Sequence, residues 1–225
     1  MLTDHRRVFA WAFGLLAATV FVFVAVGRHL PATAPRTTLS FLGEWDLAIS
    51  RAMDDIRSAP LTAIARVLNV LGGGLVTIPL RIVVAIWLLV RTRWRAFAAW
   101  ILTWAAAEIV LVGAKQFFHR GRPPGALVET VGFSFPSGHA VAGASIAVAL
   151  VLVFLPPGPA RRRLEVAAAA FAFVMALSRV YLLAHWFSDV VAGVLLGTGI
   201  ALGCAALVTE VRDVALRRRE AVPDG

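Results

Sequence analysis

The sequence predicts an all-α fold: a polytopic membrane helical bundle that forms one domain over residues 1–225. Apolar residues make up 60% of the chain, and the mean hydropathy of +0.81 is far above that of a soluble domain. The apolar residues gather in runs near the roughly 20 residues that a helix needs to cross about 30 Å of hydrocarbon. Six transmembrane helices are predicted, at residues 8–27, 69–90, 96–116, 139–156, 165–183 and 188–208.

Arginine clusters set the predicted orientation. They lie near both termini and in two short connections: His5–Arg7, Arg91–Arg95, Arg161–Arg163 and Arg212–Arg219. By the positive-inside rule, both termini and these two turns are cytoplasmic, which leaves residues 28–60, 117–138 and 183–188 outside. The net charge of +9 is therefore a feature of topology, and it does not indicate nucleic-acid binding.

The segments between the spans are predicted in chain order. The first span has the basic start of a signal peptide, but Pro35 disfavours cleavage after Ala34, so we expect a retained helix. Residues 28–60 mix charged and apolar residues, which indicates an extracytoplasmic interfacial segment with a short amphipathic helix. Residues 61–71 are predicted helical, and Gly72–Gly74 should break or bend the chain; whether 61–71 enters the bilayer is left open. Tight turns are expected at 91–97 and 156–163, and Cys204 is expected only to pack.

A second group of charges is not explained by topology. Six ionisable residues stand at span ends that the predicted topology puts on the extracytoplasmic side: Lys115, Arg122, His139, Arg179, His185 and Asp189. Placing ionisable groups within the bilayer costs free energy, so this cluster of residues indicates a functional site. Three cations with one carboxylate predict an oxyanion ligand, and arginine and lysine both suit phosphate. For Lys115 and Arg122, the alternative is that they only extend to the interface.

The fourth predicted span opens with Pro-Ser-Gly-His at 136–139. The free amides and positive dipole end of a helix start attract anions, and Gly138 has no Cβ to keep a ligand away. These residues therefore predict one wall of a phosphate site. Ser137 could also be an N-cap, a role that is compatible with phosphate contact.

The two histidines suggest different chemical roles. His185 and Asp189 are four residues apart, so their side chains share one helical face. A carboxylate bonded to one ring nitrogen leaves the other free to attack, which makes His185 the predicted nucleophile and Asp189 its partner. His139 is the predicted general acid for the leaving alkoxide. Arginines and amides would stabilise the charge, so no metal and no cofactor is predicted. The alternatives are that both histidines are inert and that Asp189 only favours its own helix start.

Three segments share a pattern with a known family: KQFFHRGRP at 115–123, PSGH at 136–139 and SRVYLLAHWFSD at 178–189. In this order they resemble the type 2 phosphatidic acid phosphatase superfamily, with the catalytic motifs over 115–189. The resemblance implies a metal-independent lipid phosphate phosphatase that works through a phosphohistidine. It implies a nucleophile at His185, its partner at Asp189, an acid at His139, and phosphate binding by Lys115, Arg122, Ser137, Gly138 and Arg179.

Four ionisable residues lie outside the motif positions. Arg120 and His119 are predicted to be solvated loop residues. Glu108 lies mid-span, two turns before Lys115, where a structural hydrogen bond is expected. Arg81 is expected either to extend to the interface or to pair with a carboxylate.

The sequence predicts an integral membrane phosphatase whose active site is on the extracytoplasmic side of the plasma membrane. The alanine- and arginine-rich composition suggests a bacterial source. The predicted partners are the bilayer and a lipid phosphate substrate of the undecaprenyl diphosphate, phosphatidic acid or phosphatidylglycerol phosphate type. A lipid phosphotransferase with the same phosphohistidine and a non-catalytic transporter or scaffold remain alternatives. A haloperoxidase of the same superfamily is disfavoured, because those members are soluble. The sequence leaves the lipid tail and the oligomeric state open.

Overall fold

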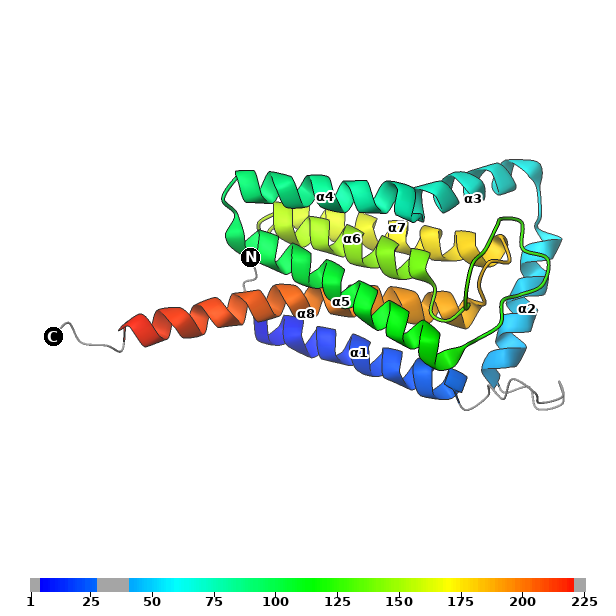
Figure 1. The fold of residues 1–225 in the computed structure, drawn as a ribbon, viewed down its shortest axis with the longest axis horizontal. Helices are drawn as coiled ribbons and strands as arrows, with labels where there is room; N and C mark the ends of the chain where they lie inside the picture. Colours follow the sequence, from blue (N-terminus) through cyan, green and yellow to red (C-terminus); the bar gives the residue numbers. More distant parts are fainter. Residues whose placement is uncertain (1–4, 28–40, 221–225) are drawn as a thin grey trace.

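The structure, a computed structural model, describes residues 5–27 and 41–220, and among these residues it contains eight helices and no strand. The helices are α1 (His5–Gly27), α2 (Phe41–Asp55), α3 (Ala59–Gly72), α4 (Gly74–Val90), α5 (Trp94–Phe118), α6 (Gly138–Phe154), α7 (Pro159–Tyr181) and α8 (Phe187–Glu220). The long helices lie side by side along one axis, and α2 crosses them at one end (Figure 1). The all-α class predicted from the sequence is confirmed.

The described residues contain four or five candidate membrane spans, where six were predicted. Four described helices are long and apolar enough to cross a membrane, namely α1, α5, α7 and α8, and α3 with α4 forms a fifth, bent candidate. Helix α6 is apolar but has only 17 residues. Prolines at 136 and at 156–157 flank it, and proline does not fit inside a helix. The chain is thus a multi-pass membrane protein, while six spans and cytoplasmic termini are not confirmed.

The predicted glycine break is confirmed between α3 and α4. The two helices meet at an angle of 44° around Gly73, so residues 61–71 belong to the first half of a bent span candidate. A Cβ at Gly72 would lie 2.7 Å from Met175 Sδ and 2.8 Å from His139 Cδ2. Glycine at this position therefore lets the bend touch the start of α6.

Both arginine-rich connections are shorter than predicted: the first was expected over 91–97, but α5 already begins at Trp94. Residues 91–93 form the first turn, where Thr92 takes a left-handed conformation with φ 52°. The second predicted turn is too long, because α7 already begins at Pro159 and includes Arg161–Arg163. Proline is well suited to the first position of a helix, so it starts α7 rather than prolonging the turn.

Helix α6 forms the centre of the bundle. It is apolar on all sides and packs against α3, α5, α7 and α8. Its closest neighbour is α8: a Cβ at Gly193 would lie 2.8 Å from Ala140 Cβ, and one at Gly197 would lie 2.5 Å from the carbonyl oxygen of Val141. Small residues four apart let membrane helices approach closely. The two helix starts are consequently adjacent.

Helix α2 is the short amphipathic helix that the sequence predicted within 28–60; residues 28–40 of that segment lie outside the described residues. Asp46, Ile49 and Met53 lie on its inner face, with Ile49 and Met53 packed against buried residues of α6, α7 and α8. Trp45 and Arg51 are exposed. Helix α2 therefore covers one end of the bundle (Figure 1).

Candidate active site

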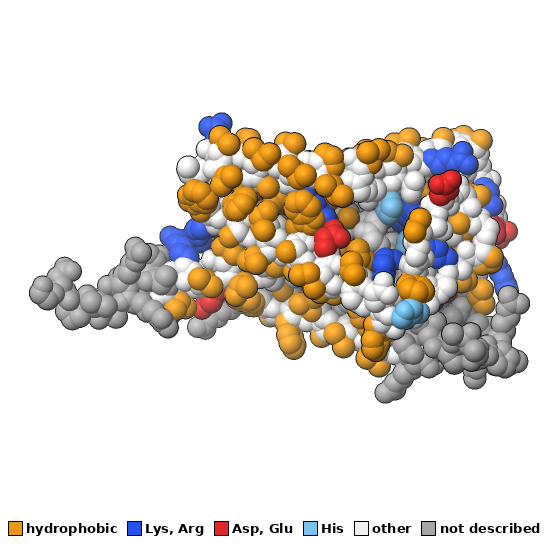
Figure 2. Space-filling model, in the orientation of Figure 1, with side chains coloured by type: hydrophobic (Ala, Val, Ile, Leu, Met, Phe, Trp, Pro, Cys, Tyr) orange, Lys and Arg blue, Asp and Glu red, His pale blue; other side chains and the backbone are white. Residues whose placement is uncertain are grey.

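The eight residues singled out in the sequence meet at the end of the bundle that α2 covers. They come from the C-terminal ends of α5 and α7, the N-terminal ends of α6 and α8, and the two intervening loops: Lys115, Arg179, Ser137, Gly138, His139, Asp189, Arg122 and His185. Figure 2 shows histidine and basic side chains gathered at this end, beside a mostly hydrophobic surface. Segments far apart in the sequence thus build one charged site.

His185 is buried in the turn between α7 and α8. Its backbone N–H donates to the carbonyl oxygen of Arg179 at 3.3 Å, which folds the turn back onto α7. The Nε2 atom lies 3.2 Å from Nη1 of Arg122. Arginine can only donate, so Nε2 accepts and the ring proton lies on Nδ1. Burial lowers the pKa of His185 to about 4; Asp189 opposes this shift, while Arg122 and Arg179 add to it. The imidazole is therefore neutral at pH 7.

Asp189 is fully buried beside His185. Its Oδ1 accepts from Arg120, and its Oδ2 accepts from the Ser134 hydroxyl and, at 2.9 Å, from the Trp186 amide. The distance from Oδ2 to His185 Nδ1 is 3.5 Å, which is too long for a good hydrogen bond and becomes an ion pair only when the ring is protonated. Asp189 thus serves its own helix start and faces the histidine at the same time.

Three cations at this end have no carboxylate partner among residues 5–27 and 41–220, namely Lys115, Arg122 and Arg179. Lys115 and Arg122 both donate to the carbonyl oxygen of Phe133. Arg122 also donates at 2.6–3.0 Å to three further carbonyls, those of Val131, Gly132 and Ala184. Carbonyl groups orient the cations without cancelling their charge. In the same part of the chain, no group of three or more His, Cys, Asp or Glu residues could hold a metal ion.

The start of α6 contributes a buried hydroxyl that no protein group satisfies. Ser137 has the extended backbone of an N-cap, but its side chain makes no cap hydrogen bond, so it is not simply a cap. Its Oγ, Arg179 Nε and His185 Nδ1 are buried and have no hydrogen-bond partner in the described chain. Buried polar atoms are nearly always satisfied. Because His185 Nδ1 faces Asp189, the two atoms that indicate a site for a polar ligand are Ser137 Oγ and Arg179 Nε.

Asn69, which sequence reasoning missed, connects the remaining two site residues, His139 and Arg179. Its carbonyl oxygen lies 2.9 Å from His139 Nε2, and its side-chain oxygen accepts from Arg179 Nη1. A carbonyl only accepts, so His139 carries a proton on Nε2 and turns Nδ1 to other partners. The one available signal was a lone amide in an apolar helix just before the triple glycine.

Family membership follows from comparison with known proteins. The sequence model of the PAP2 superfamily matches residues 97–213, which is more than half of the chain and includes all eight site residues. The chain belongs to the PAP2 superfamily. No curated protein sequence matches it.

Two crystal structures share the PAP2 fold with this chain. The first is the first transmembrane PAP2 type phosphatidylglycerolphosphate phosphatase from Bacillus subtilis, with a TM-score of 0.73 and 24% identity over 90% of this chain and 96% of that one. The second is Aquifex aeolicus LpxE, with a TM-score of 0.58 and 24% identity over 73% of this chain and 94% of that one. At such identities the likeness establishes the fold alone.

Arg120 of this PAP2 superfamily member is not the solvated loop residue that the sequence predicted. Its side chain is 12% exposed and forms ion pairs with both Asp46 and Asp189. The prediction was wrong because both carboxylates are distant in sequence, so no local pattern revealed them. His119 does lie exposed at the end of α5, with its ring edge-on to Phe133.

A second charged centre lies within the spans of this PAP2 protein. Arg81 Nη1 donates to Glu108 Oε1 at 2.5 Å, and the guanidinium lies 5.5 Å from the centre of the Trp104 ring. The indole N–H of Trp100 donates to the backbone oxygen of Arg81 at 3.0 Å. The structural hydrogen bond expected for Glu108 is confirmed, and Arg81 pairs rather than extending to the interface.

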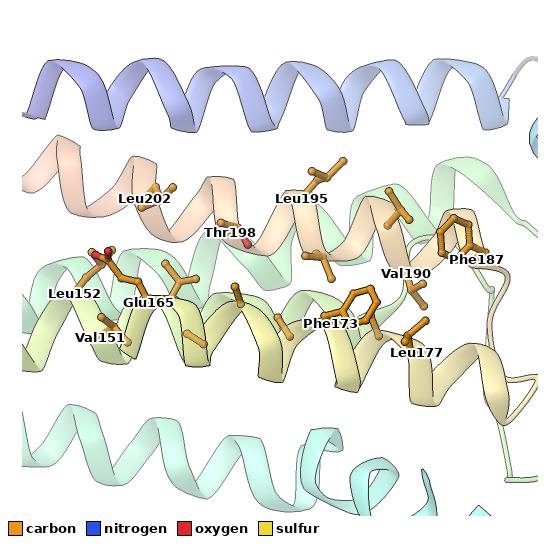
Figure 3. A pocket seen from close by; sticks show the side chains of 17 residues that line it. Val151, Leu152, Glu165, Phe173, Leu177, Phe187, Val190, Leu195, Thr198 and Leu202 are labelled. Carbon is orange, nitrogen blue, oxygen red and sulfur yellow. The ribbon is translucent and has the colours of Figure 1, made fainter. Parts of the chain in front are cut away.

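Two apolar grooves run along the PAP2 bundle from the site. The α7–α8 groove, of about 540 Å³, starts at Leu177 and Phe187 and ends near Glu165 (Figure 3). The α4–α7 groove, of about 460 Å³, starts at Leu71 and Gly72. The second groove begins beside His139, because a Cβ added to Gly72 would lie 2.8 Å from Cδ2 of the ring.

Proposed function

We propose that this chain is a membrane phosphatase that hydrolyses a lipid phosphate or diphosphate through a phosphohistidine at His185. The observation that carries the proposal is a neutral, buried imidazole surrounded by three cations without carboxylate partners and by buried polar atoms without hydrogen bonds. Such a site attracts an oxyanion and offers it a nucleophile. The whole chain, 1–225, is proposed to be one catalytic membrane domain.

The phosphate group would bind between the cations and the start of α6. Arg122, Arg179 and Lys115 supply positive charge, and the Ser137 hydroxyl and the free amides of α6 donate to the remaining oxygens. These donors are fixed before the substrate arrives, so they stabilise the charge of the transition state without having to reorganise. Gly138 leaves the backbone open to a close approach.

Bond exchange would then involve the two histidines. His185 Nε2 attacks phosphorus and forms a P–N bond while the P–O bond to the lipid breaks. His139 acts in its doubly protonated form: its Nε2 proton stays in the hydrogen bond to the Asn69 carbonyl, and its Nδ1 proton goes to the leaving oxygen. Water next attacks the phosphohistidine, His139 takes a proton from the water, and the P–N bond breaks to release inorganic phosphate and neutral His185. Asp189 stabilises the positive charge that the His185 ring carries during both steps.

The leaving group is expected to be attached to an apolar chain. In-line attack puts the leaving oxygen on the face of the phosphate opposite His185, which is the side of the proposed acid, His139. The α4–α7 groove begins there, at Gly72. A lipid alcohol could therefore occupy this groove while its phosphate reaches the charged end of the bundle.

The proposed setting is a bacterial plasma membrane with the site on its extracytoplasmic face. The support is the distribution of arginine, which concentrates at the opposite end of the bundle and at both termini. Modification of a single cysteine introduced at exposed Val131 by a membrane-impermeant thiol reagent tests the side. Labelling in intact cells agrees with the proposal, and labelling only after lysis opposes it.

Phosphate release tests the function. Purified protein in mixed micelles is incubated with phosphatidic acid, phosphatidylglycerol phosphate or undecaprenyl diphosphate in ¹⁸O-labelled water. We expect ¹⁸O in the released phosphate for at least one lipid, and no release with His185→Ala. Unlabelled products in which the phosphate has moved to a second lipid would instead indicate phosphotransfer. Binding of these lipids without any turnover would indicate a transporter or scaffold.

A further inference from the structure

Arg120 lies between two buried carboxylates that belong to different helices. Its Nη1 donates to Asp189 and, at 2.7 Å, to the Ser188 hydroxyl, and its Nη2 donates to Asp46 Oδ2 at 2.6 Å. Asp46 is 2% exposed and Asp189 is completely buried. Arg120 and Asp46 have no role in the function as described above.

Asp46 also attaches α2 to the start of α8. Its Oδ1 accepts from the backbone N–H of Ser188 at 2.8 Å, and its Oδ2 accepts from the Ser188 hydroxyl at 2.7 Å. A carboxylate at the first turn satisfies a free amide and is favoured by the helix dipole. Because Ser188 directly precedes Asp189, the covering helix is fixed to the turn that carries the nucleophile and its partner.

The bridge is a complete hydrogen-bond network, which is what makes three buried charges tolerable. The guanidinium forks to two carboxylates, and each of these carboxylates accepts further N–H or O–H donors. Asp189 and Asp46 both raise the pKa of Arg120, and together they outweigh the opposing effect of its burial. A lysine carries the same charge but not the planar fork that reaches two acceptors at once.

Charged groups approach His185 from every element around it. Asp189 from α8 is the negative one among the described residues, and the others are positive or titratable: Arg179 from α7, Arg122 from the 119–137 loop and His139 from α6. Lys115 from α5 and Arg120 lie beside Asp189 itself. Arg120 therefore competes with the imidazole for the charge of Asp189, and Asp46 in turn competes for Arg120.

We propose that Arg120 and Asp46 are positioning residues of the active site, which hold Asp189 against Nδ1 of His185 and set how strongly its charge acts on the imidazole. The proposal rests on the phosphatase function proposed above. It gives α2 an indirect role in catalysis. This helix acts on the charge around His185 through two ion pairs, Asp46–Arg120 and Arg120–Asp189.

The direction of each effect follows from the charges. Without the guanidinium, Asp189 interacts more strongly with the ring, so the pKa of His185 rises, by roughly one unit. Without the charge of Asp46, the guanidinium acts more fully on Asp189, so the pKa of His185 does not rise. Neither residue touches the phosphate, so both changes should lower kcat while KM changes little.

Histidine NMR on the full-length protein in detergent measures the first effect without any need for turnover. The ring signals are titrated in Arg120→Met, Arg120→Lys and Asp46→Asn, and His185→Gln assigns the resonance. Arg57→Met and Asp54→Asn are matched controls. This exposed arginine–aspartate pair lies at the C-terminal end of α2, the helix that carries Asp46, but it makes no ion pair with Asp189. We expect a raised His185 pKa in Arg120→Met alone, a value close to wild type in Arg120→Lys, and no change in the controls.

Kinetics with phosphatidic acid and undecaprenyl diphosphate supply the second readout. We expect kcat to fall about tenfold in Arg120→Met and in Asp46→Asn with KM within about twofold, and to recover partly in Arg120→Lys. An unchanged His185 pKa in Arg120→Met, or a kcat loss that only follows the loss of folded protein, would overturn the proposal. If the pKa shifts as expected but the wild type releases no phosphate, the proposed function has failed and the positioning role stands.

Discussion

Two charged centres in this bundle are constructed in opposite ways. In the Arg81–Glu108 centre, one cation meets one carboxylate, and an aromatic ring covers the cation. In the His185 centre, Lys115 and Arg179 have no carboxylate partner, and carbonyl or amide oxygens orient them instead. The first centre is closed in the sense that its two charges pair with each other, although the Glu108 side chain is 48% exposed, and the second centre is left with positive charge. Within one membrane protein, a ligand site is thus distinguished by incomplete pairing, not by the presence of charge.

The largest expected difference between the two centres is in catalysis. His185→Ala should lower lipid phosphate hydrolysis at least about a thousand-fold, because the proposed nucleophile is gone while the phosphate ligands remain. Glu108→Gln should leave kcat of the folded protein near the wild-type value. Phosphate release and thermal stability are measured on both variants. Equal losses of activity would contradict the distinction between a closed and an open centre.

For stability, the larger loss is expected at the Arg81–Glu108 centre rather than at the His185 centre. Arg81→Met and Glu108→Gln each remove one partner and leave the other group without its counter-charge within the spans, which should cost about 3 kcal/mol of unfolding free energy. The double variant Arg81→Met/Glu108→Met should recover much of this loss, because no unpaired charge remains. Denaturant titration in micelles measures all three variants. A double variant less stable than both single variants would show that the pair has another role.

The sequence and the structure agree best where the pattern is local. The predicted span 96–116 corresponds to α5, Trp94–Phe118, because a long apolar run has no other stable state in a bilayer. The motif residues meet for a simple reason: they stand at or next to helix ends that lie at one end of the bundle. Asn69 and Asp46 were missed because their partners are 110 and 142 residues away, and contacts of this kind leave no periodic signal. The predicted span 139–156 extends two residues beyond the end of α6 at Phe154, because Pro156 was counted as part of the span.

A smaller effect is expected from the glycine that separates the bend from the site. Gly72→Ala would place a Cβ 2.8 Å from His139 Cδ2, so the proposed acid must shift and kcat should fall about tenfold. Gly74→Ala is a matched control, because its Cβ would meet only the flexible end of Ile78 at 3.4 Å. Steady-state kinetics compare the two. Equal kcat values for both variants would mean that the contact between the bend and His139 has no catalytic importance.

The smallest expected effect is on the pH dependence of kcat, which reports the ionisation of His185. With a pKa of about 4, His185 stays neutral as the pH falls from 7 to about 5, so its ionisation should limit kcat only near pH 4. An unburied histidine would lose the free imidazole near pH 6.5. In the unfolded chain His185 gains its proton at this higher pH, so stability should decline as the pH falls from 6.5 towards 4. A kcat profile that falls with a midpoint near 6.5 would contradict a buried neutral nucleophile.

The account depends most on covalent attack by His185. Rapid mixing of the protein with excess lipid phosphate, an alkaline quench and peptide mass spectrometry would locate any phosphate bound to histidine. We predict phosphate on the peptide that contains His185 within the first turnover, formed together with the lipid alcohol and before free phosphate. Phosphate on His139, or lipid alcohol and free phosphate that appear together with no phosphohistidine, would contradict the account.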